Sequence, residues 1–329
     1  MGTLLEVKHL VTQFRVDKNK IISAVDNSSF TIDDGETLAI VGESGSGKSV
    51  TALSVMQLVP NPPGHIEAGE ILFEGQDLLK MSNAQVRAIR GNQISMIFQE
   101  PMTSLNPVYT IGKQIMESIR LHMGLSKKDA EARAVELLRK VQIPDAEKRL
   151  RNYPHQLSGG MRQRVMICMA LSCQPKLLIA DEPTTALDVT IQAQILDLIR
   201  EMRESTGASV LFITHDRGVV ADIAQRAVVM YAGNIMEMGR VRDMFLNPLH
   251  PYTQGLLKAI PKLSTPHGQE LFTIRGIVPD LSTLPKGCVF STRCDCCLDI
   301  CHRERPPLRE YEDGRRVRCF RCEGGKIVD

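Results

Sequence analysis

Eight consecutive residues, 42–49, have the types and spacing needed to hold a phosphate group. Glycine, four variable positions and then glycine, lysine and serine form the P-loop pattern, in which backbone amides and a helix N-terminus surround the anion. An apolar run at 37–41 precedes the loop and helix-forming residues at 50–58 follow it, which is the context that this pattern requires. Lys48 is expected to reach the β- and γ-phosphates, and Ser49 to bind Mg²⁺. The sequence therefore predicts a nucleoside triphosphate site formed by Gly42, Glu43, Ser44, Gly45, Ser46, Gly47, Lys48, Ser49 and Val50.

Two adjacent carboxylates, Asp181 and Glu182, end an apolar run that begins at Leu177. A strand buried on both faces has little tolerance for charge in its middle, so charges are expected at its end. There Asp181 is suited to hold Mg²⁺, and Glu182 to orient and deprotonate water. Neighbouring acids also occur in ordinary surface turns, but the P-loop in the same chain favours the catalytic interpretation.

Two more apolar runs end on a single polar group, Gln99 after 94–98 and His215 after 210–214. A lone histidine is more often structural. One that lies at the end of a core strand, as the acids do, is a candidate sensor of the γ-phosphate. Glu182 and His215 are therefore candidate catalytic residues, and the family resemblance described below adds Gln99 to them.

Phe14 lies between two expected strands, in a polar, basic stretch that the sequence predicts to be a loop. Its ring could stack on a nucleotide base, or it could pack within a strand. The sequence leaves both interpretations open, and Phe14 is kept as a candidate nucleotide-binding residue.

Ser158, Gly159 and Gly160 open a predicted helix that runs to Ser172. A serine at this place is a common N-cap. The same helix start is also a second anion-binding terminus, in a chain that already has one for its own nucleotide.

Composition limits the class of protein. The chain has 329 residues with 43% hydrophobic content and a net charge of +2, so no global field points to nucleic acid or acidic lipid. No apolar run reaches the ~20 residues that span a bilayer, and the first ten residues lack a signal-peptide core, which predicts a cytosolic protein.

Seven of the nine cysteines follow residue 287, which indicates a separate C-terminal unit. In a reducing compartment, metal binding is their default role.

Taken in order, the P-loop, Gln99, the signature 157–161, the acid pair, Asp188 and His215 resemble the motif series of ATP-binding-cassette (ABC) ATPases. The signature is the discriminating piece, because other P-loop classes lack it. Three further segments are similar to the ATPase subunits of bacterial dipeptide, oligopeptide and nickel importers. They are 98–107, 247–261, and 287–290 with its downstream cysteines.

This resemblance implies an α/β fold, with a P-loop NTPase core, an antiparallel β subdomain, an inserted helical subdomain and a small cysteine-rich C-terminal extension. The expected boundaries are 1–98 and 162–245 for the core, 99–161 for the helical signature subdomain, and 246–329 for the extension.

The resemblance also implies an assembly. Two ATPase subunits, identical or homologous, pair head to tail, and each ATP lies between one P-loop and the partner's signature. Ser158, Gly159, Gly160 and Asp188 then act in trans, while Gln99 joins Ser49 at Mg²⁺. Two integral membrane permease subunits, and indirectly an extracytoplasmic solute-binding protein, are the other expected partners. The chain is expected at the cytoplasmic face of the membrane as a peripheral subunit.

The C-terminal cysteines allow two metal centres. Spacing alone favours zinc on Cys294, Cys297, Cys319 and Cys322. The family pattern instead matches Cys288, Cys294, Cys301 and Cys319, which suits a [4Fe–4S] cluster whose four irons each take one thiolate. Eight arginines against six acids over 288–322 leave a local charge of +2, which is expected to lower the thiol pKa values. The roles of Cys296, Cys297 and Cys322 stay open.

The predicted function is ATP hydrolysis that energises import of di- or oligopeptides. Import of nickel or another small solute by the same machine stays open, because nothing in this chain contacts the solute. A soluble ABC protein that acts on nucleic acid is the alternative from another class. The absence of a strongly basic charge argues against it.

Overall fold

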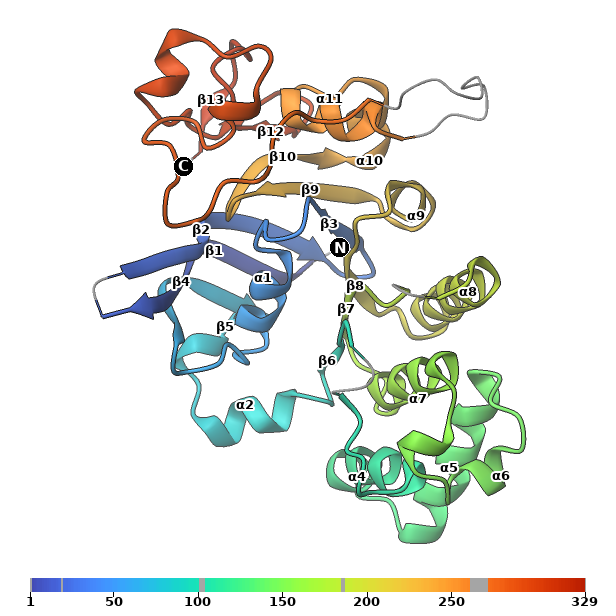
Figure 1. The fold of residues 1–329 in the computed structure, drawn as a ribbon. Helices are drawn as coiled ribbons and strands as arrows, with labels where there is room; N and C mark the ends of the chain where they lie inside the picture. The colour runs from blue at the N-terminus through green and yellow to red at the C-terminus, as the bar shows by residue number, and fades with distance from the viewer. Residues whose placement is uncertain (1, 19, 101–103, 185–186, 261–271, 329) are drawn as a thin grey trace. The chain divides into compact units, whose positions relative to one another are not determined.

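The computed structural model describes residues 2–18, 20–100, 104–184, 187–260 and 272–328 (Figure 1). Parts of three motif segments, Pro101–Thr103, Ala186 and Pro261, lie outside the described residues. The chain divides into two compact units. Unit 1 consists of Met1–Leu4, Ile32–Thr37 and Lys80–Ile213, and unit 2 consists of Leu5–Thr31, Leu38–Leu79 and Thr214–Asp329. Within the described ranges, no helix combines the length and the apolar character needed to cross a membrane.

The core of unit 1 is a parallel sheet of three short strands, in the order β8-β7-β6. The strands are β6 (Ile94–Ile97), β7 (Leu177–Asp181) and β8 (Ser209–Ile213), and every residue in them is buried. Such strands appear in the sequence as continuous apolar runs, because helices cover both faces of a parallel sheet. Their carboxyl ends are therefore the places where polar side chains reach the surface of the sheet.

Helices make up most of the remainder of unit 1. They are α2 (Asn83–Ile89), α4 (Ile111–Met123), α5 (Lys127–Lys140), α6 (Ala146–Arg149), α7 (Gly159–Leu171) and α8 (Val189–Thr206), with the 3₁₀ turn η2 (Pro154–Gln156). In α4 the buried residues Ile111, Ile115 and Ile119 recur every four positions, which places them on one face of the helix. Helices α4, α5 and α6 lie between residues 111 and 149, within the range 99–161 where the helical subdomain was expected.

Unit 2 contains a four-stranded antiparallel sheet in the order β2-β1-β4-β5. Its strands are β1 (Thr3–Asp17), β2 (Lys20–Asp33), β4 (Gly64–Phe73) and β5 (Gln76–Asp77), followed by η1 (Leu78–Lys80). The prediction that Phe14 lies in a loop was wrong, because β1 continues through it to Asp17. Phe14 is paired with Gly64, and a Cβ on that glycine would lie 2.6 Å from the Phe14 ring. The ring therefore packs across the sheet in the space that a side chain at Gly64 would fill.

The second sheet of unit 2 has the order β13-β11-β12-β10-β9-β3, in which β3 and β9 are parallel and the other pairs are antiparallel. Its strands are β3 (Thr37–Val41), β9 (Arg226–Tyr231), β10 (Asn234–Arg240), β11 (Arg309–Glu310), β12 (Arg316–Val317) and β13 (Lys326–Ile327). The helices are α1 (Lys48–Val55), α9 (Arg217–Ile223), α10 (Val241–Leu246) and α11 (Pro251–Lys258), with the 3₁₀ turns η3 (Ser291–Arg293) and η4 (Asp299–His302).

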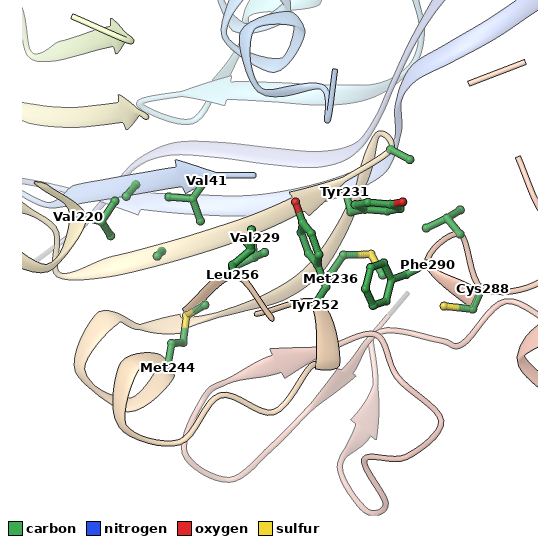
Figure 2. Close-up of a cluster of buried hydrophobic side chains, with 14 of the residues drawn as sticks. Val41, Val220, Val229, Tyr231, Met236, Met244, Tyr252, Leu256, Cys288 and Phe290 are labelled. Carbon is green, nitrogen blue, oxygen red and sulfur yellow. The ribbon is translucent and has the colours of Figure 1, made fainter. Parts of the chain in front are cut away.

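The described residues of the C-terminal region, 246–260 and 272–328, contribute side chains to a hydrophobic core that they share with strands of unit 2. Tyr231 of β9, Tyr252 of α11 and Phe290 form a cluster of rings (Figure 2). The Tyr231 centroid lies 4.8 Å from that of Tyr252 and 5.2 Å from that of Phe290, both in edge-to-face arrangements, which aromatic pairs favour. Cys288 and Cys301 belong to the same core. The extension is therefore packed against β9 and β10 and adds three short strands to their sheet.

Candidate active site

The P-loop has the backbone that its sequence predicts. It connects the fully buried strand β3 to helix α1, whose N-cap, Gly47, has a φ of 102°. A Cβ on Gly47 would lie 2.4 Å from the carbonyl oxygen of Ala24, and one on Gly42 would lie 2.2 Å from that of Met230. Side chains cannot be accommodated at either place. Two glycines of the motif are therefore needed for the close approach of neighbouring backbone as well as for the turn.

Lys48 lies over the P-loop. Its Nζ donates hydrogen bonds to the carbonyl oxygens of Gly42, at 2.9 Å, and Glu43, at 3.0 Å. No side chain caps the N-terminus of α1, and its first turn contains no acid. Helix geometry leaves the first amide groups without partners inside the helix, at the positive end of the helix dipole. Loop, lysine and helix terminus together give unit 2 a site suited to an anion.

Gln99 and Glu182 lie together in unit 1. The Nε2 of Gln99 donates a hydrogen bond of 3.1 Å to Oε2 of Glu182. Asp181 is the last residue of β7 and is buried, while Glu182 follows it and is partly exposed. The structure therefore brings together two of the predicted catalytic residues, which are 83 positions apart in the chain.

Glu182 has a backbone conformation that a residue with a side chain seldom adopts, with a φ of 46°. Such a conformation costs about 1–3 kcal/mol and persists where the surroundings impose it. Here the Glu182 amide donates to the Ile213 carbonyl at 2.9 Å, and Gln163 donates to the carbonyl of the next residue, Pro183. Eight other non-glycine residues in the described part of the chain also have a positive φ, so this conformation singles out Glu182 only together with its contact to Gln99, and no pattern in the sequence reveals it.

His215 lies in unit 2, two residues beyond the end of β8, and its side chain is exposed. The preceding residue, Thr214, is buried and its amide donates to the carbonyl of Ile40 in the P-loop strand at 3.3 Å. Asp216 then caps helix α9. His215 is thus held between Thr214, which is hydrogen-bonded to the P-loop strand, and Asp216, which caps α9.

The residues predicted to act in trans lie at two helix starts in unit 1. Ser158 is the N-cap of α7, and its side chain accepts a hydrogen bond from the Met161 amide at 3.4 Å. Apart from adjoining residues and the helix's own backbone, no atom of the described residues lies within 4 Å of a Cβ built on Gly159 or Gly160, so this helix start is open. Asp188 caps α8 by accepting from the Ile191 amide at 2.9 Å, a structural role that the sequence reasoning missed.

Six of the seven C-terminal cysteines line one small cavity of about 10 Å³. They are Cys288, Cys294, Cys296, Cys297, Cys301 and Cys319. Cys322 lines a different cavity, and its Sγ lies 3.7 Å from the carbonyl oxygen of Leu249. Across the described residues, which include all of these cysteines, no three or more His, Cys, Asp or Glu side chains are arranged to hold a metal ion.

The expectation that local positive charge lowers the thiol pKa values was wrong for most of this group. Burial raises the pKa of Cys288 to about 12 and that of Cys294 to about 11, and neighbouring thiols add to both shifts. The pKa of Cys319 is also raised, through its hydrogen bond with Cys322, while the same bond lowers that of Cys322. Desolvation of the thiols outweighs the surplus of arginines because it acts directly on the charged form.

Two contacts of the P-loop were not predicted. The main-chain amide of Glu43 donates to Tyr252, and its carboxylate accepts from Arg293. These partners are 209 and 250 positions away in the sequence, so no motif spacing could indicate them.

The geometry agrees with comparisons to known proteins. Residues 25–185 match the ABC transporter family, and residues 236–301 match the C-terminal region of oligopeptide/dipeptide transporters. The oligopeptide transport ATP-binding protein AppD of Bacillus subtilis is 54% identical over 323 residues, covering 98% of each chain. The oligopeptide transport ATP-binding protein OppD of Salmonella typhimurium is 50% identical over 320 residues, covering 97% of this chain and 94% of the relative.

Among solved structures, the dimeric ATP-binding cassette MJ0796 in a post-hydrolysis state, bound to ADP and phosphate, is similar with a TM-score of 0.66. It is 28% identical and covers 72% of this chain and 99% of its own. The cassette cbiO1 of Clostridium perfringens gives a TM-score of 0.61 at 25% identity, covering 75% of this chain and 92% of its own. Fold, motifs and sequence similarity over nearly the whole length agree, and this chain belongs to the family of ABC transporter ATPases that carry the oligopeptide/dipeptide C-terminal region.

Proposed function

We propose that this chain hydrolyses ATP to energise import of di- or oligopeptides through a membrane ABC transporter. The observation that carries the proposal is the 54% identity to an oligopeptide transport ATP-binding protein over 98% of the chain. The C-terminal region characteristic of oligopeptide/dipeptide transporters strengthens it. Import of nickel or another small solute by the same kind of machine is the alternative.

Each candidate side chain has its own role in ATP hydrolysis. Lys48 and the amides at the start of α1 neutralise charge on the phosphates of ATP. Ser49, Gln99 and Asp181 offer the oxygen ligands that Mg²⁺ prefers, and bound Mg²⁺ supplies further neutralisation of phosphate charge. Glu182 takes the proton of the attacking water, with its carboxylate oriented by the hydrogen bond from Gln99. His215 contacts the γ-phosphate.

The assembly is a head-to-tail pair of ATPase subunits, identical or homologous. In it Ser158, Gly159 and Gly160, with Asp188, face the ATP held by the partner's P-loop. The open start of α7 and the dimeric form of MJ0796 support this arrangement. Two permease subunits anchor the pair at the cytoplasmic face of the membrane, and a solute-binding protein delivers the solute from outside.

Reconstitution tests the transported solute. The chain, its partner ATPase and two co-purifying permease subunits are placed in proteoliposomes, with the solute-binding protein added outside. We expect ATP-dependent uptake of a labelled pentapeptide or dipeptide and no uptake of ⁶³Ni²⁺. Uptake of nickel alone contradicts peptide import. Binding to DNA or RNA that weakens steeply as salt rises, without co-purifying permeases, replaces transport with the nucleic-acid function.

The cysteine cavity supports a second, narrower proposal. Cys288, Cys294, Cys301 and Cys319 are candidate ligands of a [4Fe–4S] cluster, because all four line the same buried cavity. A cubane takes one thiolate at each of four separate irons, so its ligands need not converge on one point. The zinc alternative needs Cys322, which lines a different cavity although its thiol is hydrogen-bonded to Cys319. The cluster has a structural or redox-sensing role.

Two matched serine variants separate the ligand sets. Purified without oxygen, the chain is expected to contain roughly four irons and four acid-labile sulfides. Cys301→Ser is expected to remove both, whereas Cys322→Ser retains them. A colourless protein with one zinc that survives Cys301→Ser contradicts the cluster and supports the zinc set.

A further inference from the structure

Every polar group of Glu43 in the P-loop is occupied, and two of its partners come from the C-terminal region. Its amide donates to the Tyr252 hydroxyl at 3.0 Å. Its carboxylate accepts two hydrogen bonds from Arg293, at 2.6 and 3.1 Å. Its carbonyl accepts from Lys48 at 3.0 Å and from the amide of Ser46 at 3.2 Å.

Arg293 is itself rigidly held. Its side chain is only 4% exposed, and its Nε donates to the Arg275 carbonyl at 2.8 Å. Further hydrogen bonds reach the carbonyls of Ile274 and Gly276, and the guanidinium lies 5.7 Å from the centroid of Tyr231. The hydrogen bond to Glu43 raises the pKa of Arg293. A planar guanidinium fixed on several sides orients a carboxylate in one geometry, which a flexible surface pair does not.

Tyr252 is equally fixed. It lies in the first turn of α11, is fully buried, and packs against the rings of Tyr231 and Phe290 (Figure 2). A hydroxyl on such a ring is an acceptor with a defined position. The Glu43 amide is therefore hydrogen-bonded to a side chain of fixed position, Tyr252, just as its carboxylate is hydrogen-bonded to the fixed guanidinium of Arg293.

Glu43 in turn contributes to the position of Lys48. The lysine donates to the carbonyls of Glu43 and of the preceding residue, Gly42. A shift of the Glu43 backbone therefore moves both acceptors of the ammonium that binds phosphate.

We propose that Arg293 and Tyr252 are positioning residues for the P-loop, so that the C-terminal region of this chain sets its affinity for ATP. Neither residue touches the nucleotide. Both act through Glu43, whose backbone and carboxylate they hold. The proposal concerns ATP binding and does not depend on which solute the transporter carries.

The test measures the dissociation constant of a fluorescent ATP analogue for the full chain. We expect Arg293→Ala to weaken binding by about ten- to a hundredfold, the effect of losing a charged hydrogen bond. The KM for ATP is expected to rise in proportion, with kcat at saturating ATP little changed. Arg293→Lys retains the charge without the planar fork and is expected to weaken binding less.

A double-mutant cycle with Glu43→Gln shows whether the two residues act through each other. The double variant Arg293→Ala with Glu43→Gln is expected to bind the ATP analogue as tightly as whichever single variant binds it more weakly. Effects that add in full contradict the proposal.

Arg305→Ala is the matched control. Arg305 also joins the C-terminal region to the rest of unit 2, through Asp26 at 2.6 Å, but that pair is partly exposed and makes no P-loop contact. We expect unchanged ATP affinity in this variant. Equal weakening by Arg305→Ala, or unchanged affinity in folded Arg293→Ala, overturns the proposal.

Tyr252→Phe keeps the test decisive if Arg293→Ala does not fold. It retains the ring that packs in the core and removes only the hydroxyl. We expect a several-fold weaker ATP affinity at an unchanged melting temperature. Unchanged affinity in this variant contradicts the role of Tyr252, and a lower melting temperature with unchanged affinity assigns it to stability alone.

Discussion

The nucleotide motifs and the C-terminal region are assembled in different ways. In the P-loop, Lys48 folds back onto the carbonyl of Gly42, six positions away. In the C-terminal region, Arg293 reaches Glu43 across 250 positions. A contact within the motif therefore holds Lys48, whereas the contact of Arg293 with Glu43 exists only in the packed fold. We expect substitutions in the motifs to change chemistry at nearly constant stability, and substitutions in the C-terminal region to change affinity or stability at nearly constant kcat.

The largest effect is expected at Glu182. Glu182→Gln keeps the shape and a hydrogen bond to Gln99 but removes the base, so turnover should fall by about 10²–10⁴-fold. ATP binding should remain, because the amide leaves the P-loop unchanged. Phosphate release and the affinity for an ATP analogue are the two measurements, and Lys48→Ala should show the opposite pattern, with binding itself weakened.

Glu201→Gln is the control for this change, since Glu201 is an exposed acid on α8 in the same unit. It should leave both measurements as they are. Near-normal turnover in Glu182→Gln would show that another group activates water, and a large loss of thermal stability would break the contrast between the two regions.

Much of the fold could be predicted because its strands are short, buried and continuous in sequence. The apolar runs before Gly42 and through Asp181 appear as β3 and β7 with the expected ends. The family expected from the motifs is confirmed by the comparisons. In these segments local pattern and tertiary environment agree, so the sequence alone suffices.

What could not be predicted depends on contacts between distant residues. The left-handed backbone of Glu182 arises from its surroundings, and the packing of Phe14 arises from the small size of its cross-strand neighbour Gly64. The raised pKa values of Cys288 and Cys294 follow from burial, whereas net charge in the sequence suggested the opposite. Composition gives the net charge of a region, but it does not show how far burial removes the ionisable groups from water.

A second, smaller effect is expected across the ATPase dimer. A Ser158→Arg chain should bind ATP with its own P-loop while lowering hydrolysis at its partner's site by at least tenfold, since a bulky cation occupies the helix start. Each dimer pairs one Ser158→Arg chain with one chain that has the native Ser158. Glu182→Gln is placed first in one chain and then in the other, so that the remaining hydrolysis reports a single ATP site.

Ser126→Arg controls for the lost helix cap. Ser126 caps α5 with a hydrogen bond from the Asp129 amide at 3.2 Å, and it is exposed in the same helical segment. Both variants lose a cap, at a cost of about 1 kcal/mol. Only Ser158→Arg should impair the partner. Loss of the mutant chain's own ATP binding, with the partner site intact, contradicts action in trans.

The effect with the smallest influence on ATP turnover is expected in the C-terminal core, at His250, where it concerns stability. Burial lowers the pKa of His250 from its ordinary value of 6.5 to about 3. The unfolded chain therefore binds a proton more readily than the folded chain as pH falls below 6.5, and the free energy of unfolding decreases towards pH 3. The slope approaches one proton, about 1.4 kcal/mol per pH unit.

His250→Asn removes this titration. In the wild-type chain the Tyr252 amide donates to Nδ1 of His250 at 3.0 Å, and the asparagine side chain retains an acceptor for that amide. Burial also raises the pKa of the neighbouring Glu237, but that group titrates in both proteins and cancels in the difference. Urea unfolding at pH 7, 6 and 5 should show the variant less stable at pH 7, through lost packing on Phe290, with the gap narrowing as pH falls. Parallel pH profiles of the two proteins would mean that His250 keeps its ordinary pKa in the fold, and a fall in kcat at saturating ATP would mean that this part of the C-terminal region acts on the chemistry itself.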